Sequence, residues 1–210
     1  MNLTIIGASA GVGLEAVKIA LQRNHNVTTL SRSPISLPPN DNLKMVKGSA
    51  TSKVELTQSI ANAEAVIVAL GTGKSMKATT LYSDFARLLI AVQRETKTQI
   101  PFIMLTGFGA GASVNYSTFF MRLIFSLLLK RVYADKTKME ELISQSTIRW
   151  EIVRPGQLKD RPLTEKYRVE TKLFKGMNIG SINRTDVADY LVKQAENPTE
   201  LLQYVSLSNQ

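Results

Sequence analysis

The feature that most constrains the fold is a glycine-rich turn at the start of the chain. The apolar run Leu3–Ile6 predicts a short buried strand. Gly7 permits a tight turn after it, Gly11 lets the backbone approach a phosphate, and Gly13 lets a helix pack closely on the strand. Free backbone N–H groups at such a helix start attract a nucleotide pyrophosphate. An ordinary strand-to-helix turn can carry the same glycines, so the spacing alone also allows a turn without a ligand.

The residues after the turn supply the context that a dinucleotide site requires. Apolar side chains recur at helical spacing from Leu14 to Leu21 and predict a helix to about Arg23. Val27–Leu30 is rich in residues that favour strands. The first thirty residues are therefore predicted to form a strand–helix–strand unit of the length expected for dinucleotide binding.

The end of the second predicted strand indicates which dinucleotide is bound. An acidic residue there would bind the ribose 2′-hydroxyl of NAD, but this chain has Ser31, Arg32 and Ser33. An arginine between two hydroxyl groups suits the dianionic 2′-phosphate of NADP. The alternative is a solvated surface arginine, and we expect NADP.

Strands and helices continue to alternate along the chain. This order predicts an α/β fold, a Rossmann-type doubly wound parallel sheet in three layers, α/β/α. We expect one NAD(P)-binding domain over residues 1–210, with a small C-terminal portion at about 155–183 on the substrate side. Further strands are expected at 43–47, 65–70, 102–106, 150–154 and 204–207, and helices near 54–60, 81–92 and 186–195.

Three later loops are expected to complete one cleft, because ligands of such sheets bind beyond the carboxyl ends of the strands. Each loop follows a predicted strand and contains glycine, which lets the backbone approach a flat ring. The loops are Gly71–Gly73, Thr106–Gly111 and Pro155–Gln157.

The chain resembles the atypical short-chain dehydrogenase/reductases, and is similar to biliverdin/flavin reductase and to NmrA-like regulators. The segments that carry the resemblance span nearly the whole chain: Gly7–Gly13, Ala69–Gly71, Tyr133–Lys136, Val153–Leu158 and Asn183–Ala188. The resemblance implies the fold and NADP binding. The family mixes reductases with catalytically silent redox sensors, so the activity stays open between an NADPH-dependent reductase of a flavin- or quinone-like acceptor and a non-catalytic sensor.

The resemblance and the strand ends together give the expected cofactor-binding residues. Ser49 stands where relatives often place an aspartate that touches adenine. The expected set is Gly7, Ala8, Ser9, Ala10, Gly11, Val12, Gly13, Ser31, Arg32, Ser49, Ala69, Leu70, Gly71, Thr106, Lys136, Pro155 and Gly156.

The expected catalytic residues are Tyr133, Lys136 and Thr106. Short-chain dehydrogenases use a serine and a Tyr-x3-Lys pair, in which tyrosine donates a proton and lysine lowers the pKa of that tyrosine. Here the lysine stands at i+3, which still shares a helix face with Tyr133, and Thr106 takes the place of the serine. A chance pairing on a basic helix is the alternative. A flavin or quinone acceptor would need no protein acid, because solvent can supply the proton.

Composition narrows the range of partners. The net charge of +9 is spread along the chain without a basic run, so we expect no nucleic-acid partner and a small-molecule substrate. The chain has no cysteine and no cluster of His, Asp and Glu, so we expect no metal. His25, the single histidine, is expected on the surface. The chain begins with a core strand and leaves no room for a signal peptide, so a cytoplasmic location is expected.

The segment Phe119–Leu129 is eleven residues of almost unbroken apolar character. It is far shorter than the ~20 residues that span a bilayer, so we expect no membrane partner. Such a helix must be covered on most of its circumference. It is interpreted as a core helix, as a homodimer surface, or as a wall of the substrate pocket.

Overall fold

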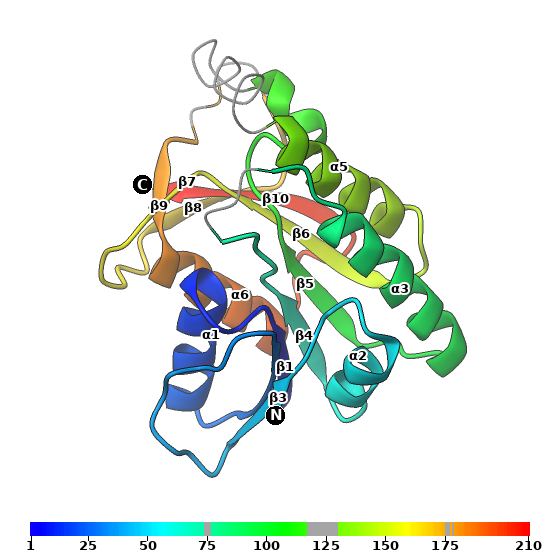
Figure 1. Cartoon of the computed structure of the whole chain (residues 1–210). Coiled ribbons are helices and arrows are strands. Elements are labelled where there is room, and N and C mark those ends of the chain that lie inside the picture. The colour runs from blue at the N-terminus through cyan, green and yellow to red at the C-terminus, as the bar shows by residue number, and fades with distance from the viewer. Residues whose placement is uncertain (74–76, 117–129, 175–176, 178) are drawn as a thin grey trace.

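The computed structural model describes residues 1–73, 77–116, 130–174, 177 and 179–210. These residues form one large twisted sheet with helices on both of its faces, and a separate small sheet of two strands (Figure 1). The predicted α/β fold, a doubly wound sheet in three layers, is confirmed. Phe119–Leu129, the expected core or dimer helix, lies outside the described residues.

The first half of the chain alternates strands and helices as the sequence predicts. The α1 helix ends close to the predicted Arg23, and α3 continues about one turn beyond the predicted end. The elements are β1 (Asn2–Ile6), α1 (Gly11–Gln22), β2 (Asn26–Ser31), β3 (Leu43–Lys47), α2 (Lys53–Ile60), β4 (Ala65–Val68), α3 (Leu81–Thr96) and β5 (Pro101–Leu105).

The second half contains three short strands that the sequence pattern did not reveal: β7, β8 and β9. They lie in the segment between β6 and α6, where periodicity is weak. The elements are the 3-10 helix η1 (Gly111–Tyr116), α5 (Lys130–Ser144), β6 (Arg149–Pro155), β7 (Gln157–Lys159), β8 (Tyr167–Glu170), β9 (Ser181–Asn183), α6 (Arg184–Glu196) and β10 (Gln203–Asn209).

The strand order of the large sheet is β3-β2-β1-β4-β5-β6-β10-β8. All its pairs are parallel except the last, in which β8 runs antiparallel to β10 and forms one edge. The predicted parallel sheet thus carries one antiparallel strand at its edge. The chain leaves β1 for β2 on one side and later returns to β4 on the other. This reversal opens a crevice at the carboxyl ends of β1 and β4, where ligands of such folds bind.

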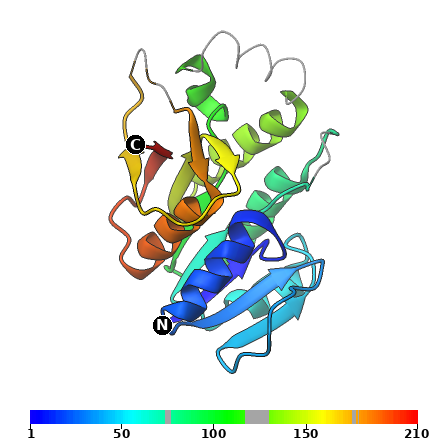
Figure 2. The same cartoon turned by 90° about the vertical axis from the view of Figure 1, so that its left-hand side faces the viewer.

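Different helices cover the two faces of the sheet (Figure 2). On β1, Leu3 and Ile5 pack with α1 and α6, while Ile6 packs with α2, α3 and α5. Strand β4 is buried at all four residues and meets helices on both faces. This explains why its sequence is uniformly apolar rather than alternating. The core therefore fixes the ends of β1 and β4 firmly beneath the crevice.

The expected surface position of His25 is wrong. The residue is buried beside α6, where its Nε2 lies 2.6 Å from Oε1 of Glu196 and its Nδ1 lies 3.5 Å from the N-terminal amine. A carboxylate more than 170 residues away in sequence determines this position, so the local turn pattern gave no sign of it.

Candidate cofactor and active site

The glycine-rich turn has the conformation that its sequence requires. Gly7 has a φ of +85°, and its N–H donates to the carbonyl oxygen of Leu30 over 2.9 Å. A methyl group on Gly7 would collide with the carbonyl oxygen of Ala69, and one on Gly13 would collide with the carbonyl oxygen of Gly7. Helix α1 can therefore approach β1 and β4 this closely only because glycine stands at both positions.

The start of α1 presents uncapped backbone N–H groups to the crevice. Ala10 occupies the N-cap position and offers no side-chain hydrogen bond, and the first turn contains no acidic residue. Gly11 has a φ of +58°, and a methyl group on it would meet nothing closer than Nε of Arg184, at 3.9 Å. The turn therefore fits a dinucleotide: its backbone is open, positively polarised and not occupied by any described side chain.

A cleft of about 640 Å³ opens over this turn. Most of the expected cofactor-binding residues line it together: Gly7, Ser9, Ala10, Gly11, Val12, Ser31, Arg32, Ser49, Ala69, Leu70, Gly71, Thr106 and Lys136. Ala8 and Gly13 instead face the interior, and Pro155 and Gly156 do not line the cleft. Gly156 packs against the backbone of Gly180, where a methyl group would come within 2.6 Å of the carbonyl oxygen.

The end of β2 combines a fixed turn with an exposed cation. Ser31 is buried, and its hydroxyl donates to the carbonyl oxygen of Ser33 over 2.8 Å, which turns the chain after the strand. Arg32 is exposed at the cleft rim. Nearby, the hydroxyl of Ser49 lies 2.8 Å from that of Thr51 and contributes to the turn before α2. Arg32 is thus exposed where an anion can reach it, while the two serines also shape the rim.

The other end of the cleft is formed by α5. Nζ of Lys136 donates to the carbonyl oxygen of Thr106 over 2.6 Å and lies 5.1 Å from the ring centroid of Tyr133. The Tyr133 hydroxyl faces Gly107, where a methyl group would come within 3.0 Å of it. Tyr133 and Lys136 therefore share one helix face, although Tyr133 does not line the cleft.

Burial changes the acidity of both groups. It raises the pKa of Tyr133 to about 12, and the negative charge of Glu140 acts in the same direction. Burial lowers the pKa of Lys136 to about 8, against the opposing effect of Glu140. A catalytic tyrosine is expected to have a lowered pKa, so the surroundings of Tyr133 act against its predicted role as proton donor.

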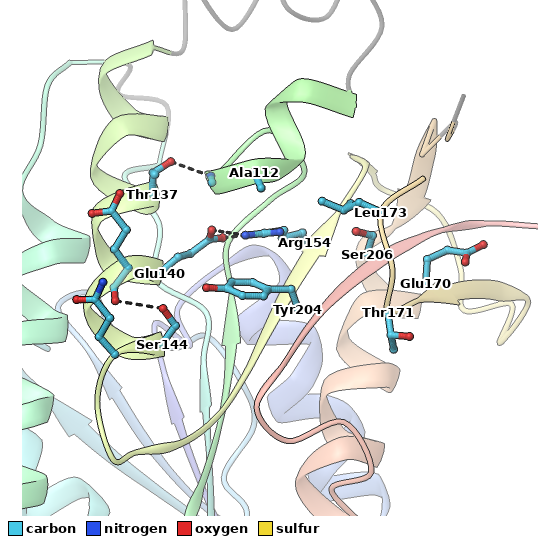
Figure 3. Close-up of a pocket in the computed structure, with 13 residues that line it drawn as sticks. Ala112, Thr137, Glu140, Ser144, Arg154, Glu170, Thr171, Leu173, Tyr204 and Ser206 are labelled. Atoms are coloured by element: carbon cyan, nitrogen blue, oxygen red, sulfur yellow. Dashed lines mark hydrogen bonds and ion pairs between the residues drawn. The ribbon is translucent and has the colours of Figure 1, made fainter. Parts of the chain in front are cut away.

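The hydroxyl of Thr106 is committed to a buried network that sequence analysis missed. It donates to Oε1 of Glu140 over 2.7 Å. Arg154 donates two hydrogen bonds to the same carboxylate, from Nε over 3.1 Å and from Nη2 over 2.6 Å. Figure 3 shows the side chains of Arg154 and Glu140 facing each other. A methyl group on Gly111 would come within 2.6 Å of this pair. Both charges are almost completely buried, so the Thr106 hydroxyl is held by a buried ion pair.

A second cavity of about 550 Å³ lies behind this ion pair, between α5 and β10 (Figure 3). Its wall contains Arg154, whose guanidinium carbon stacks 4.1 Å from the ring centroid of Tyr204. Glu140 lines this cavity too, whereas Thr106 lines the cofactor cleft. The hydrogen bond between Thr106 and Glu140 therefore joins the walls of the two cavities.

Asp135 of the Tyr133–Lys136 segment has a structural task. Its two carboxylate oxygens accept the backbone N–H groups of Tyr82 and Ser83 over 2.9 and 3.2 Å. These N–H groups begin α3, so a side chain of α5 caps that helix. The cap holds Tyr82 at the cleft, where its ring centroid lies 5.4 Å from Nζ of Lys136.

Several residues of the cleft wall were not predicted as ligand-binding residues. They are Leu30, Ser33, Gly48, Ala50, Thr72, Gly73, Leu81, Tyr82, Leu105, Val132, Leu158 and Arg184. The glycine-bearing loop after β4 pointed to Thr72 and Gly73, and Ser33 was expected beside Arg32 at the end of the second strand. Arg184 lies inside a segment that carried the family resemblance, but nothing in its local pattern distinguishes it from a surface cation at a helix start.

In the parts of the chain that the structure describes, no helix is long and apolar enough to cross a membrane.

Solved structures with this fold include ChuY, an anaerobillin reductase from Escherichia coli O157:H7, at 20% identity and a TM-score of 0.77, covering 100% of this chain and 97% of that one. A short-chain dehydrogenase/reductase from Veillonella parvula DSM 2008, in complex with NADP, matches at 16% identity and a TM-score of 0.82, covering 99% and 94%. SP1627, a candidate NADH-flavin reductase from Streptococcus pneumoniae TIGR4, matches at 22% identity and a TM-score of 0.77, covering both chains fully.

At these identities the structural likeness establishes the fold. The sequence itself matches the model of a family described as NAD(P)H-binding, over residues 7–198. The match begins at the first glycine of the turn and includes both ends of the cleft. The family resemblance inferred from the motifs is thereby confirmed: this chain belongs to the NAD(P)H-binding family.

Proposed function

We propose that this protein is an NADPH-dependent reductase that transfers a hydride to a small conjugated acceptor, of flavin or quinone type. The observation that carries the proposal is the contrast inside the cleft. Its glycine-rich end has open backbone N–H groups and an exposed arginine, while the polar side chains at its α5 end are engaged within the protein.

The glycine-rich end would hold the cofactor. The N–H groups of the first turn of α1 would receive its pyrophosphate, and Arg32 would pair with the 2′-phosphate. The absence of a carboxylate from Ser31–Ser33 supports NADPH over NADH. When bound, NADPH supplies a hydride from its nicotinamide ring and leaves as NADP⁺.

The α5 end favours an acceptor that needs no protein acid. The Thr106 hydroxyl is held by Glu140, and the pKa of Tyr133 is raised to about 12. Tyr133 is therefore a weaker acid than a free tyrosine, and the Thr106 hydroxyl is already donated, so neither group is activated for proton transfer to a ketone or aldehyde. A flavin or quinone spreads the charge that arrives with the hydride, and water can then supply the proton.

A small apolar cluster lies beyond the end of β5, close in sequence to Thr106 of the cleft. Phe108 follows Thr106 by two residues and is buried with Met177 and Ile179, and Leu173 and Tyr116 pack against them. The N–H of Phe108 donates to the carbonyl oxygen of Pro155 over 2.9 Å, which ties this cluster to the end of β6. None of these five residues lines the cofactor cleft, so the cluster would stiffen the loop after β5 rather than contact the acceptor.

The test is a titration of the purified protein with NADPH and NADH, followed by addition of FMN and a small quinone. We expect NADPH to bind more tightly than NADH, and the absorbance of NADPH to fall only after an acceptor is added. Tight binding without turnover of any acceptor would contradict the reductase proposal and favour a sensor of the NADP(H) ratio. Absence of binding would overturn both.

A further inference from the structure

Arg184 opens α6 and lines the cofactor cleft, opposite the start of α1. A methyl group on Gly11 would lie 3.9 Å from its Nε. Its guanidinium therefore lies beside the part of the turn where the backbone is left open. Arg32, in contrast, approaches the cleft from the end of β2.

Buried contacts on both sides of Arg184 fix its backbone. Ile182 of β9 is fully buried and pairs with Leu158 of β7. Asn183 is also buried, and its Nδ2 donates to Asp186 over 2.7 Å. The carboxylate of Asp186 accepts the backbone N–H groups of Thr164 and Glu165 as well. The backbone of Arg184 is therefore ordered before a ligand binds, and binding carries no entropy cost for fixing it.

The side chain of Arg184 is held more loosely than its backbone. Its Nη1 donates to Oδ1 of Asp160 over 2.6 Å, but the side chain of Asp160 is 88% exposed and that of Arg184 is 30% exposed. Ion pairs that are this accessible to water contribute little to stability. A ligand phosphate at the start of α1 can therefore compete with Asp160 for the guanidinium, which can bind two oxygens at once.

We propose that Arg184 is a cofactor-binding residue that holds the pyrophosphate of the dinucleotide, and that Asp160 competes with that pyrophosphate for it. The proposal rests on NAD(P)H binding in this cleft. It assigns the two cleft arginines different tasks. Arg184 binds a group that NADPH and NADH share, while Arg32 binds the group that distinguishes them.

The experiment measures the affinities of four proteins for NADPH, NADH and adenosine 2′-monophosphate, which carries the 2′-phosphate but no pyrophosphate. The proteins are wild type, Arg184→Ala, Asp160→Asn and Arg94→Ala. Arg94 is an exposed arginine near the end of α3, outside the cleft lining, and serves as the control for a change of net charge. Arg184→Ala is expected to weaken NADPH and NADH equally, by about tenfold or more, and to leave the monophosphate unchanged.

Asp160→Asn is expected to tighten the binding of both dinucleotides by about two- to fivefold, and Arg94→Ala to change neither affinity. An affinity of Arg184→Ala for NADH within about twofold of wild type would overturn the proposal. If Arg184→Ala does not fold, the exposed Asp160→Asn variant decides, because unchanged dinucleotide affinity there also overturns it. Failure of the wild type to bind either dinucleotide would instead contradict the proposed function.

Discussion

The two ends of the cofactor cleft are constructed on opposite principles. At the glycine-rich end, backbone N–H groups of α1 are uncapped and Arg32 is exposed, so the binding groups are available before a ligand arrives. At the α5 end, Lys136 and Thr106 already have protein partners, and the charged pair beneath them is almost completely buried. The first end is suited to binding an anion. The second is suited to holding a fixed shape against which an acceptor can lie.

The largest expected effect tests the structural character of the α5 end. Arg154→Met leaves the carboxylate of Glu140 buried without its partner, and we expect it to lower the free energy of unfolding by about 3–5 kcal/mol. Urea denaturation measures the loss. The control is the double variant Glu140→Gln/Arg154→Met, which removes both charges and is expected to recover at least half of it. A loss below roughly 1 kcal/mol in the single variant would show that this pair does not fix the α5 end.

The two ends also differ in how far sequence alone could predict them. The glycine-rich end depends on local patterns, such as Leu3–Ile6 and the spacing of Gly7, Gly11 and Gly13, and the structure places these as expected. At the α5 end, Glu140 was not singled out from its charged helix. Its burial depends on Arg154 of β6, which reaches it only after the chain has folded.

The same reason explains the elements that were missed. Strand β8 is four residues long, and none of its residues, Tyr167–Glu170, is fully buried. It is recognised as a strand only through its pairing with β10, about 40 residues later. Likewise, Arg184 looks like an ordinary cation at a helix start until β7 and β9 bring it to the cleft. Local periodicity carries no information about such distant pairings.

The second prediction tests the binding end. Arg32→Ala should cost about 1.5–3 kcal/mol of NADPH affinity, because a charge-assisted contact with the 2′-phosphate is lost. NADH affinity should change little. Titration with both cofactors measures the difference, and Arg94→Ala, which removes an exposed cation near the end of α3, is the matched control. Equal losses for the two cofactors would contradict the assignment of Arg32 to the 2′-phosphate.

The third prediction concerns the buried ammonium group of the α5 end. Because the folded pKa of Lys136 is lowered to about 8, the folded protein releases this proton while the unfolded chain keeps it up to about its ordinary pKa of 10.5. The unfolded state therefore binds more protons in this window, and the free energy of unfolding contributed by Lys136 rises with pH. Between pH 8 and 10, we expect the free energy of unfolding of wild type to rise by about 1 kcal/mol more than that of Lys136→Met.

Urea denaturation of both proteins across that range provides the measurement. Tyr82 and Tyr133, which contact Lys136, stay protonated in the folded protein over this range because their pKa values are raised to about 12. Groups that do not contact Lys136 titrate in both proteins alike, so the difference between the two curves isolates Lys136. A difference that stays constant with pH would mean that the ammonium group is solvated like that of a surface lysine. The α5 end would then be less enclosed than the contacts of Lys136 with Thr106, Tyr82 and Tyr133 indicate.

The smallest expected effect tests whether Tyr133 only encloses the α5 end of the cleft or also donates a proton to the acceptor. If solvent protonates the acceptor, Tyr133→Phe removes only a hydroxyl whose pKa is raised to about 12, and kcat with a quinone should stay within about threefold of wild type. A general acid would contribute about a hundredfold or more, so the two roles are well separated. Steady-state rates with a quinone and with an aldehyde distinguish them further. A loss of a hundredfold with the aldehyde alone would show that Tyr133 donates a proton when the acceptor demands one, and the α5 end would then be chemically active as well as rigid.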